Sequence, residues 1–594
     1  MIHLSATEFP SGVDIDQKPV GHLPLIRAII DDLGIVGVLD ELLPPDPRSR
    51  VSDGECVAAM ILNILQGRVA LYSMEQWLAS TDCELLFGEG CEADAFNDAR
   101  LATCLDHIAA RGTEQTLSGV ISAYLCREHE VLPRAYSVHH DITSIKVYGA
   151  YAGWSEEPGP EPTHGFSKDR RPDLKQLVFG LALHGSVGIP LTSAMYDGNE
   201  SDSHSNRVNL DQLADLLPEQ DEVTVVGDCK LVDARTIGQI LDHHFHFVSL
   251  VPHTFKSRAE LVEEVRRSEE PMPELARQPG RTKKDAPNVY RGRSVDRPFV
   301  VGLANAGTLR EEMLRFLVVE SSQLDGEESA TIEHRKAKER EQFEAAFRKV
   351  AKLSYSCAED AAAAVVRLTR GLDYHRATTE VIVESVAEKR RPGRPRSDEA
   401  APTRDVYRPK LLALEEDAAA VERAHFHARH FVLVTDHLDR VAWPDQRVLA
   451  EYRHQYLVEG QTGFRWLKNT ATVAPVLLHT PARIAALGVV LVLALMVRNY
   501  LQFTLRRRLA ETGATVPDRV KKPTRMPTAE TAIIAFARIA SVCLYTNGRL
   551  ARRDVTPLGV AAKTILRLLG IPESIFTSPR PRKPPHSVAE IPGM

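Results

Sequence analysis

The chain has 594 residues, which is too long for one hydrophobic core and predicts several domains of about 150 residues each. With 43% hydrophobic and 26% charged residues, its composition is that of a globular protein and excludes a disordered chain. The formal net charge of -7 excludes a surface that is positive throughout, so any contact with nucleic acid must come from local basic patches.

The cysteines and the apolar segments indicate which cellular compartment to expect. The eight cysteines include no CxxC pair and no zinc-ligand spacing, which indicates a reducing compartment and no structural zinc. The N-terminus has neither a basic segment nor an apolar run, so we expect no secretory signal. The longest apolar run, Ile484 to Val497, falls short of the roughly 20 residues that cross a bilayer and predicts a buried core helix.

The first part of the chain predicts an all-helical domain. We expect residues 1–20 to be flexible, whereas residues 21–130 have apolar residues at helical spacing. Two capping-box patterns, Ser52 to Glu55 and Ser73 to Gln76, indicate helix starts. Such a domain can bind DNA ends or serve only packing and dimerisation, and the residues favour neither over the other.

Two predicted strands each end at an aspartate. Arg134 to Tyr148 is rich in strand-forming residues and presents Asp141, and Glu222 to Gly227 delivers Asp228 in the same way. Each aspartate taken alone is explained as well by an acidic turn residue. A third carboxylate, Glu459, follows far downstream on a predicted helix, and three carboxylates on rigid elements are what a two-metal phosphoryl-transfer site requires.

Residues 131–252 alternate strands and helices in the order βββαβαβ. After the Asp141 strand we expect strands at 174–184 and 189–196, a helix at 203–217, the Asp228 strand, a helix at 233–243 and a strand at 245–251. This order is the core of the ribonuclease H-like fold, an α/β fold whose acidic groups gather where the first and fourth strands end side by side. Asp141 and Asp228 fall at those two places.

Residues 253–440 predict an insertion domain, because a connection of this length must hold structure of its own. Short strands are expected at 289–295, 297–304, 314–321 and 431–436, and long helices within 333–372. The basic segment from Lys389 to Arg396 resembles an AT-hook, whose extended Arg-Pro chain fits a narrow minor groove. A basic, proline-stiffened linker is an equally good explanation.

Residues 441–512 complete the predicted core, and 513–594 form a predicted C-terminal helical segment with a basic tail. We expect one helix from Trp443 to Lys468, on which Tyr452, Glu459 and Trp466 are spaced seven apart and share a face. Another helix is expected from Ala529 to Tyr545. The proline-rich tail has no apolar periodicity and should be mobile.

Several stretches together resemble bacterial insertion-sequence transposases of the Asp-Asp-Glu class, in the branch with a Tyr-Arg-Glu-Lys-type signature and a β-rich insertion domain. The resemblance covers nearly the whole chain, including the helical region before the core, and is most specific in the loop GFSKDRRPDLKQ. The stretches that carry it are His140 to Ser144, Gly165 to Gln176, Tyr196 to Asp202, Gly227-Asp228 and Tyr452 to Lys468.

The chain departs from this family signature at two positions. The signature has arginine four residues before the glutamate and lysine seven residues after it, where this chain has Gln455 and Trp466. Arg453, Arg465 and Lys468 are nearby, so the residue that contacts DNA phosphate stays open. The two departures also leave open whether the activity of this chain is impaired.

The resemblance implies a DNA transposase that uses Mg²⁺, with Mn²⁺ as a substitute. Two ions about 3.5 to 4 Å apart activate the nucleophile and neutralise charge on the phosphate. We assign Asp141 as ligand to both ions, Asp228 to one and Glu459 to the other. The same site would nick DNA at the ends of the element by hydrolysis and join the 3'-hydroxyl ends to target DNA.

The expected partner is double-stranded DNA, both element ends and target, with no membrane. Acting on two ends implies a homodimer or larger assembly in the DNA complex, and the expected location is the bacterial cytoplasm, at the nucleoid. The residues expected to contact DNA are basic or aromatic and comprise Lys168, Arg170, Arg171, Lys175, Arg391, Arg394, Arg396, Tyr452, Arg465 and Lys468.

Two other functions share much of this pattern. A metal-dependent nuclease without strand transfer would keep the fold and all three carboxylates. A catalytically impaired, transposase-derived DNA-binding protein would keep the basic segments and tolerate loss of a carboxylate. A tyrosine recombinase is a weaker rival, because no nucleophilic tyrosine stands convincingly among arginines and histidines before the C-terminus.

Overall fold

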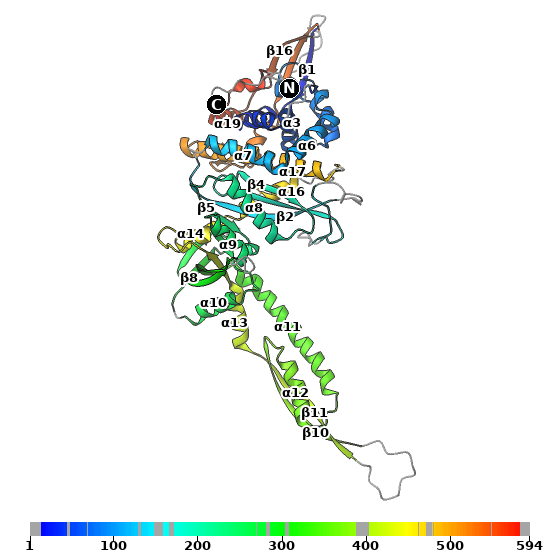
Figure 1. The fold of residues 1–594 in the computed structure, drawn as a ribbon, viewed down its shortest axis with the longest axis vertical. Coiled ribbons are helices and arrows are strands. Elements are labelled where there is room, and N and C mark those ends of the chain that lie inside the picture. Colours follow the sequence, from blue (N-terminus) through cyan, green and yellow to red (C-terminus); the bar gives the residue numbers. More distant parts are fainter. Residues whose placement is uncertain are drawn as a thin grey trace, which may run out of the picture. The chain divides into compact units, whose positions relative to one another are not determined.

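In the computed structural model, the chain folds into two compact units (Figure 1). Unit 1 comprises Met1–Ser249, Val300–Glu312 and Ala450–Met594, and unit 2 comprises Leu250–Phe299 and Met313–Leu449. The residues that the structure describes are 13–43, 48–67, 69–128, 132–147, 159–165, 171–268, 270–280, 286–302, 308–387, 403–460, 463–470, 478, 480–547 and 549–581.

Unit 1 begins with a helical region. Ser52 caps α3 as its capping box predicts, since its side chain accepts a hydrogen bond from the Glu55 N–H at 3.2 Å. Ser73 precedes α4, but its side chain makes no such bond there. The helices are α1 (Leu23–Asp32), α2 (Ile35–Leu42), α3 (Asp53–Gln66), α4 (Met74–Ala79), α5 (Cys83–Phe87), α6 (Asp98–Arg111) and α7 (Thr113–Glu128).

Five strands of unit 1 form a mixed sheet in the order β4-β3-β2-β5-β6. Neighbours β4, β3 and β2 pair antiparallel, whereas β2, β5 and β6 pair parallel. Each element lies within about two residues of its expected bounds. Along the chain they are β2 (Ala135–Lys146), β3 (Gln176–His184), β4 (Pro190–Tyr196), α8 (Asp202–Leu216), β5 (Glu222–Gly227), α9 (Ala234–Asp242) and β6 (His246–Leu250).

Helix α17 (Pro481–Thr512) is the central helix of unit 1. It packs against β4 and against helices α1, α3, α6, α7, α18 and α19. By length and composition it could cross a membrane, yet 94% of its most apolar 18-residue window is buried inside the structure. The run Ile484 to Val497 is thus part of a buried helix that is longer than the run itself.

Two expectations about the chain ends are wrong. Residues 13–19 were expected to be flexible but form β1 (Val13–Pro19), because β15 (Ala540–Thr546) offers them an antiparallel partner. The helix expected from Ala529 to Tyr545 ends at Ile534 as α18 (Ala529–Ile534), and the residues beyond it form β15. Strand β15 is held between β1 and β16 (Arg549–Val555), so nonlocal pairing overrides the helical pattern.

The chain after α17 contains one further small sheet and one further helix. Strands β13 (Val516–Pro517) and β14 (Pro523–Thr524) form a hairpin, and α19 (Val560–Leu569) packs against β13. The described residues between 513 and 581 therefore mix strands and helices, where a helical segment was expected before the basic tail.

Unit 2 combines a sheet with a long helical and β-hairpin arm (Figure 1). The two strands expected at 289–295 and 297–304 are one continuous strand, β8, which runs through Asp296 to Val301. The sheet order is β12-β9-β8-β7, with β7 (Glu274–Gln278), β8 (Asn288–Val301), β9 (Arg310–Ser321) and β12 (His430–Thr435). The remaining elements are α10 (Lys256–Arg267), α11 (Leu324–Ala351), α12 (Ala358–Thr369), β10 (His375–Ala387), β11 (Thr403–Glu416) and α13 (Ala418–Arg429).

The single helix expected from Trp443 to Lys468 is also wrong. The chain forms three short helices, α14 (Asp445–Arg453), α15 (Tyr456–Glu459) and α16 (Phe464–Thr470). Tyr452, Glu459 and Trp466 therefore do not share a face of one helix. The breaks fall at the turn residues His454 and Gln455 and at Gly460 and Gly463.

A buried ion pair joins the two ends of unit 1. Asp82, the N-cap of α5, accepts hydrogen bonds from Arg553 Nε at 2.7 Å and from Ser541 Oγ at 2.6 Å. Burial alone would raise the pKa of the Asp82 carboxyl, but the bonds from Ser541 and Arg553 hold it below its ordinary value. The charged pair thereby fastens the strands β15 and β16 to the N-terminal helices.

We expect Arg553→Met to lower the free energy of unfolding by about 3 to 5 kcal/mol, because it leaves the Asp82 carboxylate buried without its cation. Urea unfolding at pH 7 measures this loss. The control Arg552→Met removes an arginine that is 71% exposed, and it should change stability by less than about 0.5 kcal/mol. The ion pair stabilises only while Asp82 is ionised, so its contribution should disappear as pH falls through the lowered pKa of Asp82. Equal stability of the two variants at pH 7 would contradict the assignment.

Candidate functional site

The parallel pairing of β2 with β5 sets Asp141 beside Asp228. The register matches His139 with Val226, and each aspartate stands two residues beyond that pair. Neighbouring strands lie about 4.8 Å apart and residues in register share a face, so the two aspartates lie next to each other. Asp228 follows the last residue of β5, as expected. The expectation that the other strand ends at Asp141 is wrong, because β3 pairs with β2 beyond Asp141 and the strand continues to Lys146. A Cβ atom at Gly227 would lie 3.7 Å from His140 O, which shows that the strands remain adjacent up to the aspartates.

The backbone around both aspartates is fixed by hydrogen bonds. Ser249 Oγ on β6 donates to Asp228 O at 2.7 Å and to Gly227 O at 3.2 Å. Asp228 Oδ1 accepts from the Lys230 N–H at 2.9 Å, and Asp141 Oδ1 accepts from the Ile142 N–H at 2.7 Å. One oxygen of each carboxylate is thus oriented by local backbone, and both side chains remain half-buried.

Glu459 ends the short helix α15, which packs against β2 and β3. Val458, its neighbour, is fully buried and anchors the helix. Phe464 at the start of α16 meets Phe179 of β3 edge to face, with ring centroids 6.4 Å apart. Glu459 itself is exposed, so the packing holds its backbone on the sheet and leaves its carboxylate at the surface.

The pKa of Tyr452 on α14 responds to both Glu459 and Asp228. Burial is the main cause that raises the pKa of its phenol, and the negative charges of Asp228 and then Glu459 raise it further. Both carboxylates are therefore close enough to Tyr452 for their charges to act on it. The phenol stays protonated at neutral pH and can donate a hydrogen bond.

Two glycines make the turn after Glu459 possible. A Cβ atom at Gly463 would lie 2.0 Å from Val458 O, and one at Gly460 would lie 2.4 Å from Tyr456 O. The turn is closed by bonds from the Gly460 N–H to Tyr456 O at 2.7 Å and from the Arg465 N–H to Gly460 O at 3.1 Å. The glycines thus let the chain double back beside the glutamate.

The two histidines before Asp141 are buried in the sheet. His139 is completely buried and His140 is 3% exposed. Burial, with smaller contributions from His454 and His184, lowers the pKa of His139 to about 3, so its ring is neutral at physiological pH. His139 Nε2 lies 3.1 Å from Ser137 Oγ, which indicates a packing role.

Only some of the predicted DNA-contacting residues lie within the described part of the chain, and these differ in exposure and in their contacts. Lys168, Arg170, Arg391, Arg394 and Arg396 lie outside the described residues. Arg171 is exposed, but its guanidinium holds Asp173 through bonds of 2.6 and 2.8 Å, and this contact is the main cause that lowers the pKa of Asp173 to about 2. Arg465 is exposed, and Lys175 and Lys468 are half-exposed.

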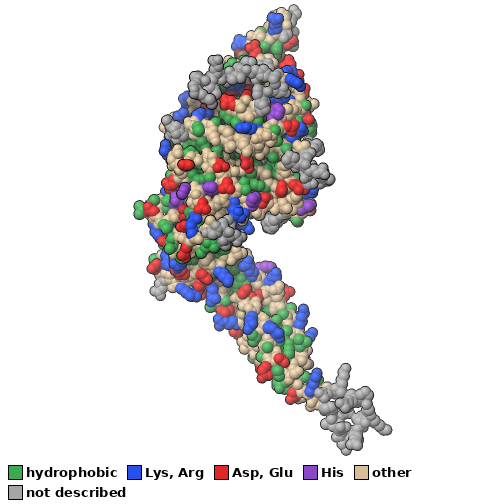
Figure 2. Space-filling view, in the orientation of Figure 1, with side chains coloured by type: hydrophobic (Ala, Val, Ile, Leu, Met, Phe, Trp, Pro, Cys, Tyr) green, Lys and Arg blue, Asp and Glu red, His purple; other side chains and the backbone are tan. Residues whose placement is uncertain are grey.

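Basic and acidic side chains are mixed on the face of the molecule that Figure 2 shows. No single basic surface dominates the described residues in that view, as the net charge of -7 suggests. On this face, an anionic ligand would be held by small local groups of cations.

The local packing explains why Gln455 and Trp466 stand at the two positions that depart from the family signature. Gln455 is only 6% exposed, so an arginine there would be a buried cation. The guanidinium carbon of Arg498 lies 5.4 Å from the centroid of the Trp466 ring, and Arg498 Nε also donates to Glu530 at 2.8 Å. These contacts account for a neutral residue at 455 and an aromatic residue at 466.

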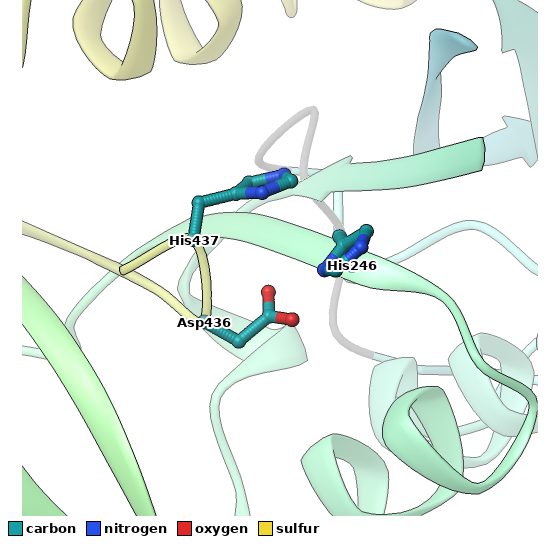
Figure 3. A group of neighbouring side chains, drawn as sticks. All are labelled: His246, Asp436 and His437. Carbon is teal, nitrogen blue, oxygen red and sulfur yellow. The ribbon is translucent and has the colours of Figure 1, made fainter. Parts of the chain in front are cut away.

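Sequence reasoning did not single out Asp436 and His437, which follow β12 in unit 2 (Figure 3). The His437 ring stacks on Trp443 with centroids 3.6 Å apart, and its carbonyl accepts a bond from the buried Arg315 at 3.3 Å. These contacts give His437 a packing role within its unit. The third residue in Figure 3, His246, is the first residue of β6 in unit 1.

Comparisons with known proteins give limited matches. A family model described as a domain of unknown function, DUF4277, matches residues 15–122. Among solved structures, the chain is similar to the cryo-EM structure of a piggyBac transposase synaptic complex with hairpin DNA, with 8% identity, a TM-score of 0.32 and coverage of 88% of this chain and 82% of that chain. A similarity of this size does not establish a shared fold. No curated protein matches.

We expect Gly463→Ala to disrupt the turn beside Glu459, because the new Cβ atom would lie 2.0 Å from Val458 O. Relieving this overlap should cost about 1 to 3 kcal/mol locally. Amide hydrogen exchange at Gly460, Arg465 and Leu467 should become about tenfold faster or more, while exchange in β2 and β5 stays unchanged. The matched control is Gly37→Ala, where a Cβ atom meets nothing within 4 Å. Unchanged exchange at all three amides in Gly463→Ala would refute the role of this glycine.

Proposed function

We propose that this protein is a DNA transposase of the Asp-Asp-Glu class, built on a ribonuclease H-like core. It would bind the ends of its own insertion element, nick the DNA by hydrolysis and join the 3'-hydroxyl ends to target DNA. The observation that supports this proposal most strongly is the parallel register of β2 and β5, which sets Asp141 next to Asp228.

The three carboxylates suit a hard divalent cation. Asp141 and Asp228 stand side by side on rigid strands, and the charges of Asp228 and Glu459 both act on Tyr452. Oxygen ligands of this kind are those that Mg²⁺ prefers, and Mn²⁺ accepts them as well. When bound, two such ions would activate the attacking water or 3'-hydroxyl and neutralise charge on the phosphate.

The residues of the chain itself orient the site. Ser249 and the Lys230 N–H fix the end of β5, so that Asp228 keeps one direction. Tyr452 stays protonated, because burial and the charges of Asp228 and Glu459 raise its pKa, and it would donate a hydrogen bond to a phosphate oxygen near the carboxylates. Arg465 and Lys468 follow the glycine turn. Among the described cations that are predicted to contact DNA, these two are nearest in sequence to Glu459.

Two alternative functions predict different activities from those of a transposase. A metal-dependent nuclease would use the same carboxylates without strand transfer. A catalytically impaired DNA-binding protein is suggested by Gln455 and Trp466, but the burial of Gln455 and the Arg498 contact of Trp466 give both residues a structural reason. In the proposed complex the protein acts on two DNA ends and is at least a homodimer.

We expect Asp141→Asn, Asp228→Asn and Glu459→Gln each to reduce Mg²⁺-dependent cleavage of a labelled duplex that carries the element end. Each substitution would remove a metal ligand, so the loss should exceed the roughly 100-fold that follows removal of a residue that only hydrogen-bonds to a ligand. DNA affinity should remain. The control is Asp215→Asn, an exposed carboxylate on α8, which should leave cleavage unchanged.

The products distinguish the alternatives. Joining of the cleaved end to a target plasmid supports the transposase, whereas cleavage without joining supports the nuclease. Full activity of Glu459→Gln would show that Glu459 is not the third ligand. An intact protein that binds the duplex but never cuts it would support the impaired DNA-binding protein.

A further inference from the structure

The hairpin between α17 and α18 is a small basic element that the proposed catalytic site does not use. It starts after Gly513, which caps α17 in the left-handed conformation, and its strands pair Val516 with Thr524 and Pro517 with Pro523. The segment 513–528 contains four basic residues and one acidic residue, Asp518. Its sequence, GATVPDRVKKPTRMPT, has no apolar periodicity that would predict a core element.

The turn of this hairpin is held by the side chain of Asp518. Asp518 Oδ1 accepts from the Val520 N–H at 2.9 Å and from the Lys522 N–H at 2.7 Å. The Asp518 N–H in turn donates to Lys522 O at 2.8 Å. Lys521 sits at φ 61°, a left-handed conformation that these bonds hold in place. The acidic residue of the segment is therefore engaged inside the turn.

The base of the hairpin is braced by the helices next to it. Arg506 Nε of α17 donates to Pro527 O at 2.8 Å, and the Arg525 guanidinium donates to Gly513 O at 3.2 Å. Val516 is 2% exposed and β13 packs on α19. With Pro517 opposite Pro523, the hairpin is rigid before any ligand binds, so that binding would cost little conformational entropy.

The tip presents cations to solvent. Arg519, Lys521 and Lys522 are exposed, and within the described residues no ion pair joins them to an acidic side chain. Val520 between them is 70% exposed. A rigid turn that projects three cations carries a local positive potential on a chain whose net charge is -7.

We propose that the turn Asp518–Lys522 binds the phosphate backbone of double-stranded DNA through Arg519, Lys521 and Lys522. This inference rests on the proposed function, which makes duplex DNA the substrate. Contacts of this kind position a protein on DNA without reading its sequence. The hairpin is thus a DNA-anchoring element separate from the carboxylates and from the basic residues already assigned.

The test measures how duplex binding depends on salt. Fluorescence anisotropy with a labelled duplex of arbitrary sequence, in EDTA to prevent cleavage, gives the slope of log K against log salt. Each phosphate contact contributes about 0.9 to that slope, so Arg519→Gln/Lys522→Gln should make it shallower by about 1.8 and weaken binding at low salt. Lys521 is left intact because its left-handed backbone makes substitution there a test of the turn as well.

The matched control is Arg549→Gln/Arg552→Gln, which removes two exposed cations from β16 and should leave the slope unchanged. A hairpin variant with the slope of the intact protein would overturn the proposal, and so would an equal change in the control, because net charge would then explain both. Thermal unfolding midpoints equal to that of the intact protein would show that both variants are folded. If the intact protein itself fails to bind duplex DNA, the proposed function fails and not the hairpin assignment alone.

Discussion

The parallel pairing of β2 with β5 is the constraint on which the candidate site depends. This register places Asp141, inside β2, beside Asp228, which directly follows β5. Ser249 on the next strand fixes the end of β5, and α15, which ends at Glu459, packs against β2 and β3. Any slip of β5 by one residue would turn Asp228 to the opposite face of the sheet.

Local patterns were enough to predict the elements that carry the aspartates, because β-propensity and helix caps act over a few residues. They were not enough for the region around Glu459. The sequence shows Gly460 and Gly463, but only the fold shows that Val458 O and Tyr456 O occupy the space of their missing side chains. The pairing of β1 with β15 was equally out of reach, since its partners lie at opposite ends of the chain.

Helix α17 shows why a hydropathy pattern finds only part of a buried helix when polar residues are buried as well. The apolar run ends at Val497, yet Arg498 and Asn499 are each 1% exposed. Arg498 is neutralised by Glu530 on α18, and Asn499 Nδ2 donates to Gly188 O at 2.7 Å. These partners lie in distant parts of the sequence, so burial of the two residues could not be inferred locally. The same contacts tie the helix to the β3–β4 turn and place Arg498 over Trp466.

The central claim, that Asp141, Asp228 and Glu459 together hold one pair of metal ions, is tested most directly by iron-mediated cleavage of the protein itself. Fe²⁺ bound in place of Mg²⁺, with ascorbate and peroxide, produces hydroxyl radicals that cut the backbone near the metal. Our account predicts cuts near all three residues, each suppressed by excess Mg²⁺. Cuts near Asp141 and Asp228 without one near Glu459, or cuts that Mg²⁺ does not suppress, would contradict it.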